Sequence, residues 1–131
     1  MKNMQLEQNK AIIRLVFESA MNQGNLAIID EIFDPRFVDH STADQVAGPA
    51  GVRDYFTQVR AGFPDIHVTI DNLIAEGSSV AVRTTWHGTH LGTYEGIAPT
   101  DRQVTRTMIQ IFLVADGKIL EEWNEGKGLL E

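Results

Sequence analysis

The spacing of apolar residues along the chain changes once, near Phe63. Before that point apolar residues recur at helical spacing, which predicts helices at roughly residues 5–22, 25–33 and 49–62. After it they recur at every second position, which predicts strands from residue 66 and from residue 80. Three helices followed by strands with short connections are typical of an α+β fold with a mainly antiparallel sheet.

The clearest local signal is a β-hairpin over residues 104–125. Asp116-Gly117 lies between two strand-like runs, and tight hairpin turns favour this dipeptide because both residues adopt positive φ. The run Met108–Val114 is apolar except at Gln110, so we expect a central strand buried on both faces.

The two strands of this hairpin place polar groups on an apolar face. If the turn is centred on Asp116-Gly117, we expect one face of the first strand to pair with one face of the second: Met108, Gln110 and Phe112 with Leu120, Glu122 and Asn124. Ile119, Glu121 and Trp123 then point to the opposite face. Gln110, Glu122 and Asn124 then either satisfy one another or serve a ligand.

Composition narrows the class of protein. The chain has 131 residues, which favours one domain, and a formal net charge of −7 with no basic stripe, which argues against nucleic-acid binding. It has no cysteine, hence no disulfide and no thiol nucleophile. The polar N-terminus and the lack of a long apolar run predict a cytoplasmic protein without a membrane segment.

Two residues are candidates for proton transfer. His40 ends the turn-like segment 34–40, before a small polar loop at 41–45, and is either a general base or a loop histidine bonded to backbone. Glu122 exchanges protons near neutral pH if its face is enclosed, and is an ordinary solvated glutamate if it lies at the rim.

Other candidates are assigned to ligand contact or to structure. Trp86, Met108 and Phe112 are core residues that also line a pocket if there is one. Tyr94 is a candidate lid or proton donor to a ligand carbonyl, and His90, between Gly88 and Gly92, is either a pocket residue or a structural one. We expect no metal site and no cofactor, because no HExxH arrangement, nucleophile elbow or phosphate loop is present.

Several short motifs are distributed along the chain. In chain order they are Phe37-Val38-Asp39-His40, Gly48-Pro49-Ala50-Gly51-Val52, Phe63-Pro64-Asp65, Gly88-Thr89-His90-Leu91-Gly92, Gly96-Ile97-Ala98-Pro99-Thr100 and Asp116-Gly117-Lys118-Ile119-Leu120-Glu121-Glu122-Trp123. Taken together, they resemble those of the SnoaL-like polyketide cyclase (ester cyclase) family, within the nuclear-transport-factor-2-like superfamily. They span nearly the whole chain, and in combination they are specific.

The resemblance implies a curved sheet wrapped around three helices into a cone with an apolar interior pocket. It also implies ring closure by aldol chemistry without metal, with an aspartate on the last strand as acid and base, helped by histidines. Two positions depart from the family: Asn124 replaces that acid, and Asp101 replaces a glycine in Pro99-Thr100-Asp101-Arg102.

Two functions follow as hypotheses. The first is an enzyme that removes an acidic C–H proton from a small apolar carbonyl compound, with His40 and Glu122 exchanging the proton and Gln110 and Asn124 donating to the enolate. The second is a ligand-binding or scaffold protein of the same fold, which Asn124 favours.

We also expect a homodimer. Ile109, Ile111 and Leu113 form an apolar outer sheet face that the helices leave uncovered, and such a face is normally buried against a partner.

Overall fold

The computed structural model describes residues 2–41 and 46–131, so part of the loop expected at 41–45 lies outside the described residues. Its helical elements are α1 (Lys2–Arg14), η1 (Leu15–Met21), α2 (Ile28–Ile32) and α3 (Pro49–Gly62). Its strands are β1 (Phe33–Asp39), β2 (His67–Glu76), β3 (Ser79–Thr89), β4 (Gln103–Ala115) and β5 (Lys118–Gly126). None of the described helices is long and apolar enough to cross a membrane.

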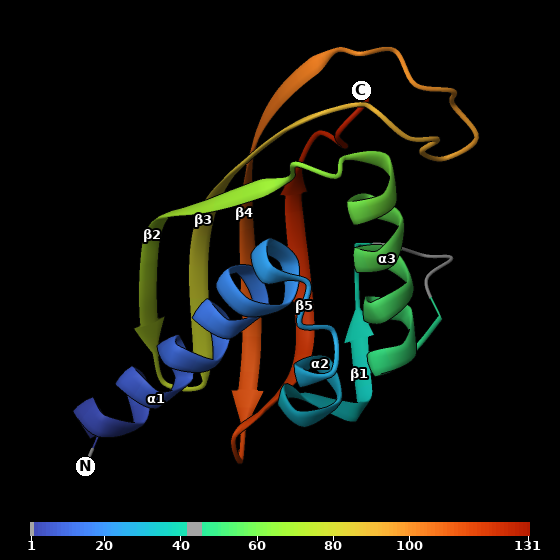
Figure 1. Ribbon diagram of the computed structural model, residues 1–131. Coiled ribbons are helices and arrows are strands. Elements are labelled where there is room, and N and C mark those ends of the chain that lie inside the picture. The colour runs from blue at the N-terminus through green and yellow to red at the C-terminus, as the bar shows by residue number, and fades with distance from the viewer. Residues whose placement is uncertain (1, 42–45) are drawn as a thin grey trace.

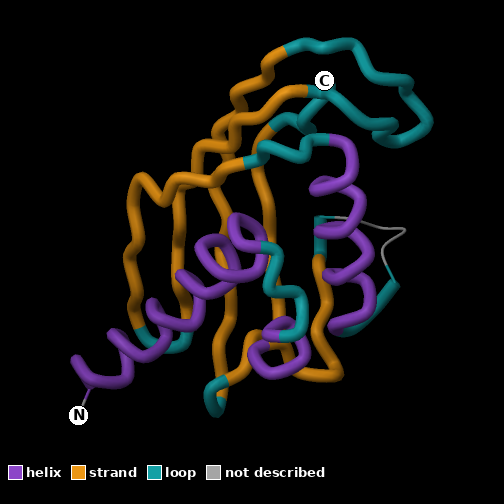
Figure 2. The backbone as a smooth tube through the Cα atoms, viewed as in Figure 1, coloured by secondary structure: helices purple, strands orange, loops and turns teal. Residues whose placement is uncertain are grey.

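The five strands form one curved sheet in the order β1-β5-β4-β3-β2. Three neighbouring pairs are antiparallel, and β1 pairs parallel to β5 at the edge. Figures 1 and 2 show all the helices on one side of this sheet, with α1 crossing in front of it and α3 beside β1. The predicted α+β class with a mainly antiparallel sheet is confirmed.

The helix predictions hold to different degrees. The third helix has the predicted bounds, and the first begins earlier and becomes a π-helix at η1, whose Val16, Phe17, Ala20 and Met21 are buried. The second is shorter than predicted, because the residues before it form a turn. There Asn25 bonds back to Ser19 through its backbone N–H and its side-chain amide instead of capping α2.

The segment 34–40 is not the turn that was predicted. It forms most of β1, in which Phe33 and Phe37 are buried against each other with ring centroids 4.7 Å apart. The sequence pattern does not predict this strand, because its core residues are four apart and it contains Pro35, which is tolerated at a sheet edge. This segment is a strand because its backbone pairs with β5, although no alternation of apolar and polar residues marks it in the sequence.

The hairpin turn is confirmed, but the return strand contains a bulge. Asp116 and Gly117 both have positive φ, 52° and 77°. Val114 pairs with Ile119 while Leu113 pairs with Glu121, so Leu120 is the extra residue. The bulge moves Ile119 to the core face, which corrects the predicted grouping of Ile119 with Glu121 and Trp123 and of Leu120 with Glu122.

The strand β4 is central, as predicted, but it is not buried on both faces within this chain. Phe112 and Val114 face the core, whereas Ile109 and Ile111 are 52% and 43% exposed on the other side. The reason is that all the helices cover the same face of the sheet. The outer face therefore carries an exposed apolar strip.

The long β3–β4 loop is held against the C-terminal end of α3. The backbone N–H groups of Leu91 and Gly92 both donate to the carbonyl oxygen of Gly62. A Cβ atom at Gly92 would lie 2.1 Å from the carbonyl oxygen of Ala61, which is backbone and unable to yield by a side-chain rotation. Only glycine fits this close approach.

We predict that Gly92→Ala lowers the free energy of unfolding by about 1–3 kcal/mol, because the added methyl group overlaps backbone. Gly77→Ala is the control, since a Cβ there meets nothing within 4 Å and costs only the strain of a positive φ. Urea unfolding followed by far-UV circular dichroism measures both. Equal destabilisation by the two substitutions would contradict this account.

Candidate functional site

A cavity of about 270 Å³ lies between the helices and the concave face of the sheet. Aromatic side chains from helices and strands form much of its wall: Phe17, Phe33, Tyr55, Phe56, Trp86 and Phe112. Polar side chains from β1, β4, β5 and the adjoining segments also line it: Asp39, Ser41, Gln110, Glu122, Asn124 and Glu131. The cavity therefore combines apolar walls with a concentrated group of polar side chains.

A chain of hydrogen bonds begins in the core and ends at Glu122. The indole Nε1 of Trp86 donates to Thr84 Oγ1 over 2.9 Å, and that hydroxyl donates to Gln110 Oε1 over 3.2 Å. An indole N–H can only donate, so this order leaves the amide NH₂ of Gln110 facing Glu122, where Nε2 donates to Oε2 over 3.1 Å. The core thus orients Gln110 as a donor to the Glu122 carboxyl.

A second group joins the end of β1 to β5. Asn124 Nδ2 lies 3.3 Å from both carboxylate oxygens of Asp39. Ser41 Oγ accepts from the backbone N–H of Asn124 over 2.7 Å, and the backbone N–H of Ser41 donates to Asp39 Oδ1 over 2.9 Å. Asp39 is therefore held in place beside Asn124, with its carboxylate at the cavity.

The two carboxyl groups influence each other. Burial, and after it repulsion from the Asp39 carboxylate, raise the pKa of Glu122 to about 8, against the donations from Gln110 and Asn124 that lower it. A carboxyl with this pKa exchanges protons near neutral pH. Such a shift is characteristic of acid and base groups in functional sites.

Tyr55 places a neutral phenol in the cavity. Burial raises its pKa to about 12, with the negative charges of Glu122 and Asp39 contributing, so the hydroxyl stays protonated. Tyr94 lies behind it, buried against Phe63, and interacts with Tyr55 through the side-chain hydroxyls. Burial also raises the pKa of Tyr94. Tyr55 is thus a protonated phenol that lines the same cavity as the two carboxyl groups.

The structure brings most of the predicted site residues together. Trp86, Met108, Gln110, Phe112, Glu122 and Asn124 all line the cavity. His40, His90 and Tyr94 do not belong to its lining. The register of β4 on β5 explains the agreement. The bulge at Leu120 shifts the pairing by one residue, so Gln110 pairs with Asn124 and Phe112 with Glu122.

His40 and Glu122 are not brought together. Asp39 pairs with Glu122, so the next residue along the chain faces the other side of the sheet. There the His40 ring stacks on Trp123 with centroids 4.8 Å apart, and its Nε2 lies 2.7 Å from Glu121 Oε1. The residue that shares the cavity with Glu122 is Asp39, one position before the residue that was expected.

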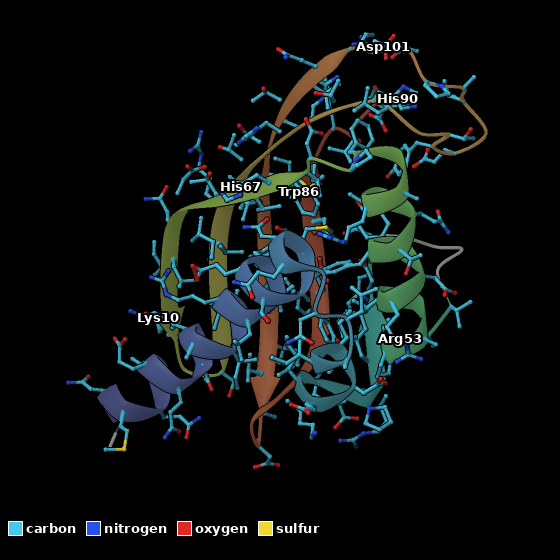
Figure 3. The ribbon with its side chains drawn as sticks, viewed as in Figure 1. Lys10, Arg53, His67, Trp86, His90 and Asp101 are labelled. Carbon is cyan, nitrogen blue, oxygen red and sulfur yellow. The ribbon has the colours of Figure 1, made fainter. Side chains whose placement is uncertain are left out.

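His90 and Tyr94 have structural surroundings. The imidazole of His90 is fully buried, stacks on Phe63 at 5.4 Å, and bonds through Nδ1 to Thr100 Oγ1 over 2.9 Å. Figure 3 shows His90 in the loop beyond the end of α3, separated from Trp86 in the interior. His90 therefore joins the two ends of the β3–β4 loop, and Tyr94 reaches the cavity only through Tyr55.

The sequence analysis missed Asp39, Ser41 and Tyr55. Asp39 follows from strand parity once β1 is recognised as a strand, and Tyr55 lies three residues after Val52 on the buried side of α3. Among the residues that the structure describes, no three His, Cys, Asp or Glu side chains are arranged to hold a metal ion. The chemistry available in the cavity is that of carboxyl, amide and phenol groups.

Comparison with known proteins identifies a family and several relatives with a similar fold. Residues 11–126 match the family model described as SnoaL-like polyketide cyclase. The chain is 28% identical over 117 residues to nogalonic acid methyl ester cyclase of Streptomyces nogalater, covering 86% of this chain and 87% of that protein. Among solved structures, AclR of Streptomyces galilaeus superposes with a TM-score of 0.79 at 27% identity, covering 93% of this chain and 90% of its own. IdmH of Streptomyces antibioticus superposes with a TM-score of 0.77 at 29% identity, covering 92% of both chains.

We predict that Glu122 makes the protein less stable as pH rises. Its pKa is about 8 when folded and near the usual 4.5 when unfolded, so between these values the folded protein keeps a proton that the unfolded chain has lost. The free energy of unfolding should therefore fall with pH, by up to about 1.4 kcal/mol per pH unit from this group. Urea unfolding across this pH interval measures the effect. The contribution of Glu122 is the difference in the free energy of unfolding between the unmodified protein and Glu122→Gln.

Glu121→Gln, on the other face of the same strand, is the matched control and should keep the slope. The added prediction is that Asp39→Asn lowers the pKa of Glu122 without restoring 4.5, because burial is the larger cause. A Glu122→Gln protein with the same pH dependence as the unmodified one would show that Glu122 titrates normally.

Proposed function

The chain belongs to the SnoaL-like polyketide cyclase family, and we propose that it catalyses acid–base proton transfer on a small, mostly apolar carbonyl compound bound in the cavity. The observation that carries this proposal is the pairing of two carboxyl groups, Asp39 and Glu122, across one aromatic-lined cavity. The aromatic wall suits an apolar body, and the polar group provides proton acceptors and donors where the reacting end would lie.

Glu122 is the group that exchanges the proton. Its pKa of about 8 is close to ambient pH, where a general base combines a useful ionised fraction with strong basicity. Gln110 holds one carboxyl oxygen, which fixes the orientation of the group. Asn124, which cannot accept a proton from carbon, instead positions Asp39.

The reaction proceeds in two proton transfers with one bond formed between them. The carboxylate of Glu122 removes the acidic C–H proton, and the electron pair left on carbon delocalises as an enolate. That carbon attacks a second carbonyl carbon of the same molecule, closing the ring, and Glu122 returns the proton to the alkoxide oxygen. The atoms and charges balance without a metal ion or a cofactor.

Tyr55 stabilises the negative charge as it develops. Its hydroxyl is protonated and faces the cavity, so it can donate a hydrogen bond to the enolate oxygen. Hydrogen-bond donors that are already oriented before the reaction, in a site with little water, stabilise the developing charge more than the same donors do in solution. His40 is assigned no proton transfer in this mechanism, because its ring lies against Trp123 on the opposite face.

We predict that the protein accelerates deuterium exchange at the acidic C–H of ethyl benzylacetoacetate, a neutral apolar β-keto ester, measured by NMR in D₂O. Glu122→Gln should slow the bound exchange by about 10²-fold or more, and the rate of the unmodified protein should rise with pH through about 8 as Glu122 ionises.

Glu121→Gln and His40→Ala are the controls, because both side chains contact each other outside the cavity. Both should leave the exchange rate within a few-fold of the unmodified protein. If the bound ester exchanges no faster than the free ester, the enzymatic proposal fails.

The alternative is a non-catalytic binding protein of the same fold. One observation favours it: Asn124 occupies the position where the resemblance leads us to expect an acid. Saturable binding of the keto ester without accelerated exchange would select this function. The same experiment therefore separates the two.

We further propose that a second copy of the chain covers the outer sheet face. Ile109, Ile111 and Trp123, on adjacent strands, are 52%, 43% and 41% exposed, and an apolar strip of this kind is normally buried against a partner. Ile111→Lys should convert the dimer to a monomer in analytical ultracentrifugation at micromolar concentration, while Ile97→Lys, at an exposed isoleucine in the β3–β4 loop, should not. A monomeric unmodified protein would count against the proposal.

A further inference from the structure

We propose that Arg106 is a positioning residue of the site, because it holds residues 127–131 as a wall of the cavity that keeps water away from Glu122. Residues 127–131, the closing segment, follow β5 directly. The inference rests on the proposed function in that Glu122 is the group that exchanges the proton. It adds the residue that maintains the enclosed surroundings of that carboxyl.

The closing segment begins where the chain leaves the sheet. Gly126, the last residue of β5, pairs with Met108, whereas β4 continues to Gln103 paired with β3. Gly126 has a φ of 149°, and a Cβ atom there would lie 2.9 Å from the carbonyl oxygen of Thr107, so this change of direction requires glycine. Figure 1 shows the chain leaving β5 at the end of the sheet where the β3–β4 loop lies.

The closing segment then lies against the cavity. Gly128 and Glu131 belong to the lining that also contains Glu122. Leu129, between them, is 1% exposed and anchors the segment in the core. Among the described residues, the backbone of the segment bonds within itself, from the N–H of Glu131 to the carbonyl oxygen of Gly128 over 3.2 Å, and otherwise only to the side chain of Arg106.

Arg106 extends from β4 on the same face as Met108, which lines the cavity. Its Nε donates to the carbonyl oxygen of Gly128 over 3.2 Å, and Nη2 donates to the carbonyl oxygen of Glu131 over 2.5 Å. Its Nη1 donates to the carbonyl oxygen of Thr105 over 3.0 Å, which ties the guanidinium to its own strand. The donors of a guanidinium lie in one plane with fixed directions, so a single arginine fixes two points of the closing segment relative to β4.

The consequence of this wall is the environment of Glu122. Burial is the largest cause of its raised pKa, followed by the charge of Asp39. A loosened wall admits water, which stabilises the carboxylate and lowers the pKa. Loss of the Arg106 charge acts with the opposite sign, because removing a cation makes a carboxyl harder to ionise. The direction of the change therefore distinguishes a residue that holds the wall from one that acts through its charge.

The test is a ¹³C NMR titration of the Glu122 carboxyl without ligand, with the signal assigned by its loss in Glu122→Gln. The unmodified protein should give a pKa of about 8. Arg106→Gln should lower this pKa by about 1 or more, and Arg106→Lys should lower it less, because lysine keeps the charge and one donor group. Leu129→Ala should also lower it, because it loosens the same segment and leaves Arg106 in place.

Two matched controls remove the same side chains from exposed positions outside the cavity lining. They are Arg102→Gln, just before β4, and Leu91→Ala, in the β3–β4 loop, and both should leave the pKa unchanged. The titratable groups that line the cavity with Glu122 are Asp39 from β1, Tyr55 from α3 and Glu131 from the closing segment. Glu131→Gln should change the pKa little, because the Glu131 charge is not among the causes of the shift.

An unchanged or raised pKa of Glu122 in Arg106→Gln would overturn the inference. So would a Leu129→Ala protein that titrates like Leu91→Ala, because the effect would then not pass through the closing segment. A pKa near 4.5 in the unmodified protein would also overturn it. The proposed function fails when the bound keto ester exchanges no faster than the free ester, whatever the titration shows, so the two failures are distinguishable.

Discussion

The site depends on how β1 pairs with β5. In that parallel register Asp39 lies beside Glu122, so two side chains of the same charge project from neighbouring strands into one cavity. The backbone N–H of His40 donates to the carbonyl oxygen of Glu122, which holds the register at the point where the carboxyl groups meet. A shift by one residue would exchange Asp39 for His40 in the cavity and would separate the two acids.

This arrangement stores unfavourable free energy. Burying Glu122 next to Asp39 disfavours its ionised form, and the raised pKa expresses that cost. The surrounding structure supports it through hydrogen bonds. Thr84, itself bonded by Trp86, orients the amide of Gln110, and the backbone N–H of Asn124 donates to Ser41 Oγ. Functional sites often contain locally unfavourable arrangements that the rest of the fold holds in place.

The two faces of β5 carry different groups of side chains, because successive residues of a strand point to opposite faces. Glu122 and Asn124 face the cavity, whereas Glu121 and Trp123 meet His40 on the outer side. Leu120 is an extra residue, so Ile119 before it lies on the same face as Glu122 and Asn124 after it. The extra residue Leu120 thus places a buried apolar side chain and two polar side chains on the same face of β5.

The sequence by itself determined the elements whose periodicity is strong. The helix at 49–62 and the hairpin turn at Asp116-Gly117 follow from local pattern and turn chemistry, whereas the pairing of Gln110 with Asn124 depends on the bulge at Leu120. The family followed from motifs that are each continuous in the chain. Six of the predicted site residues line the cavity: Trp86, Met108, Gln110, Phe112, Glu122 and Asn124.

Only the tertiary structure decided which acid accompanies Glu122. The strand β1 has no alternating pattern, so its parity, and with it the choice of Asp39 over His40, came from backbone pairing with a strand about 80 residues later in the chain. The same holds for the pKa of Glu122, since burial and the Asp39 charge exist only once helices, β1 and β5 enclose a common space. Long-range packing, and not local preference, created the chemistry of the site.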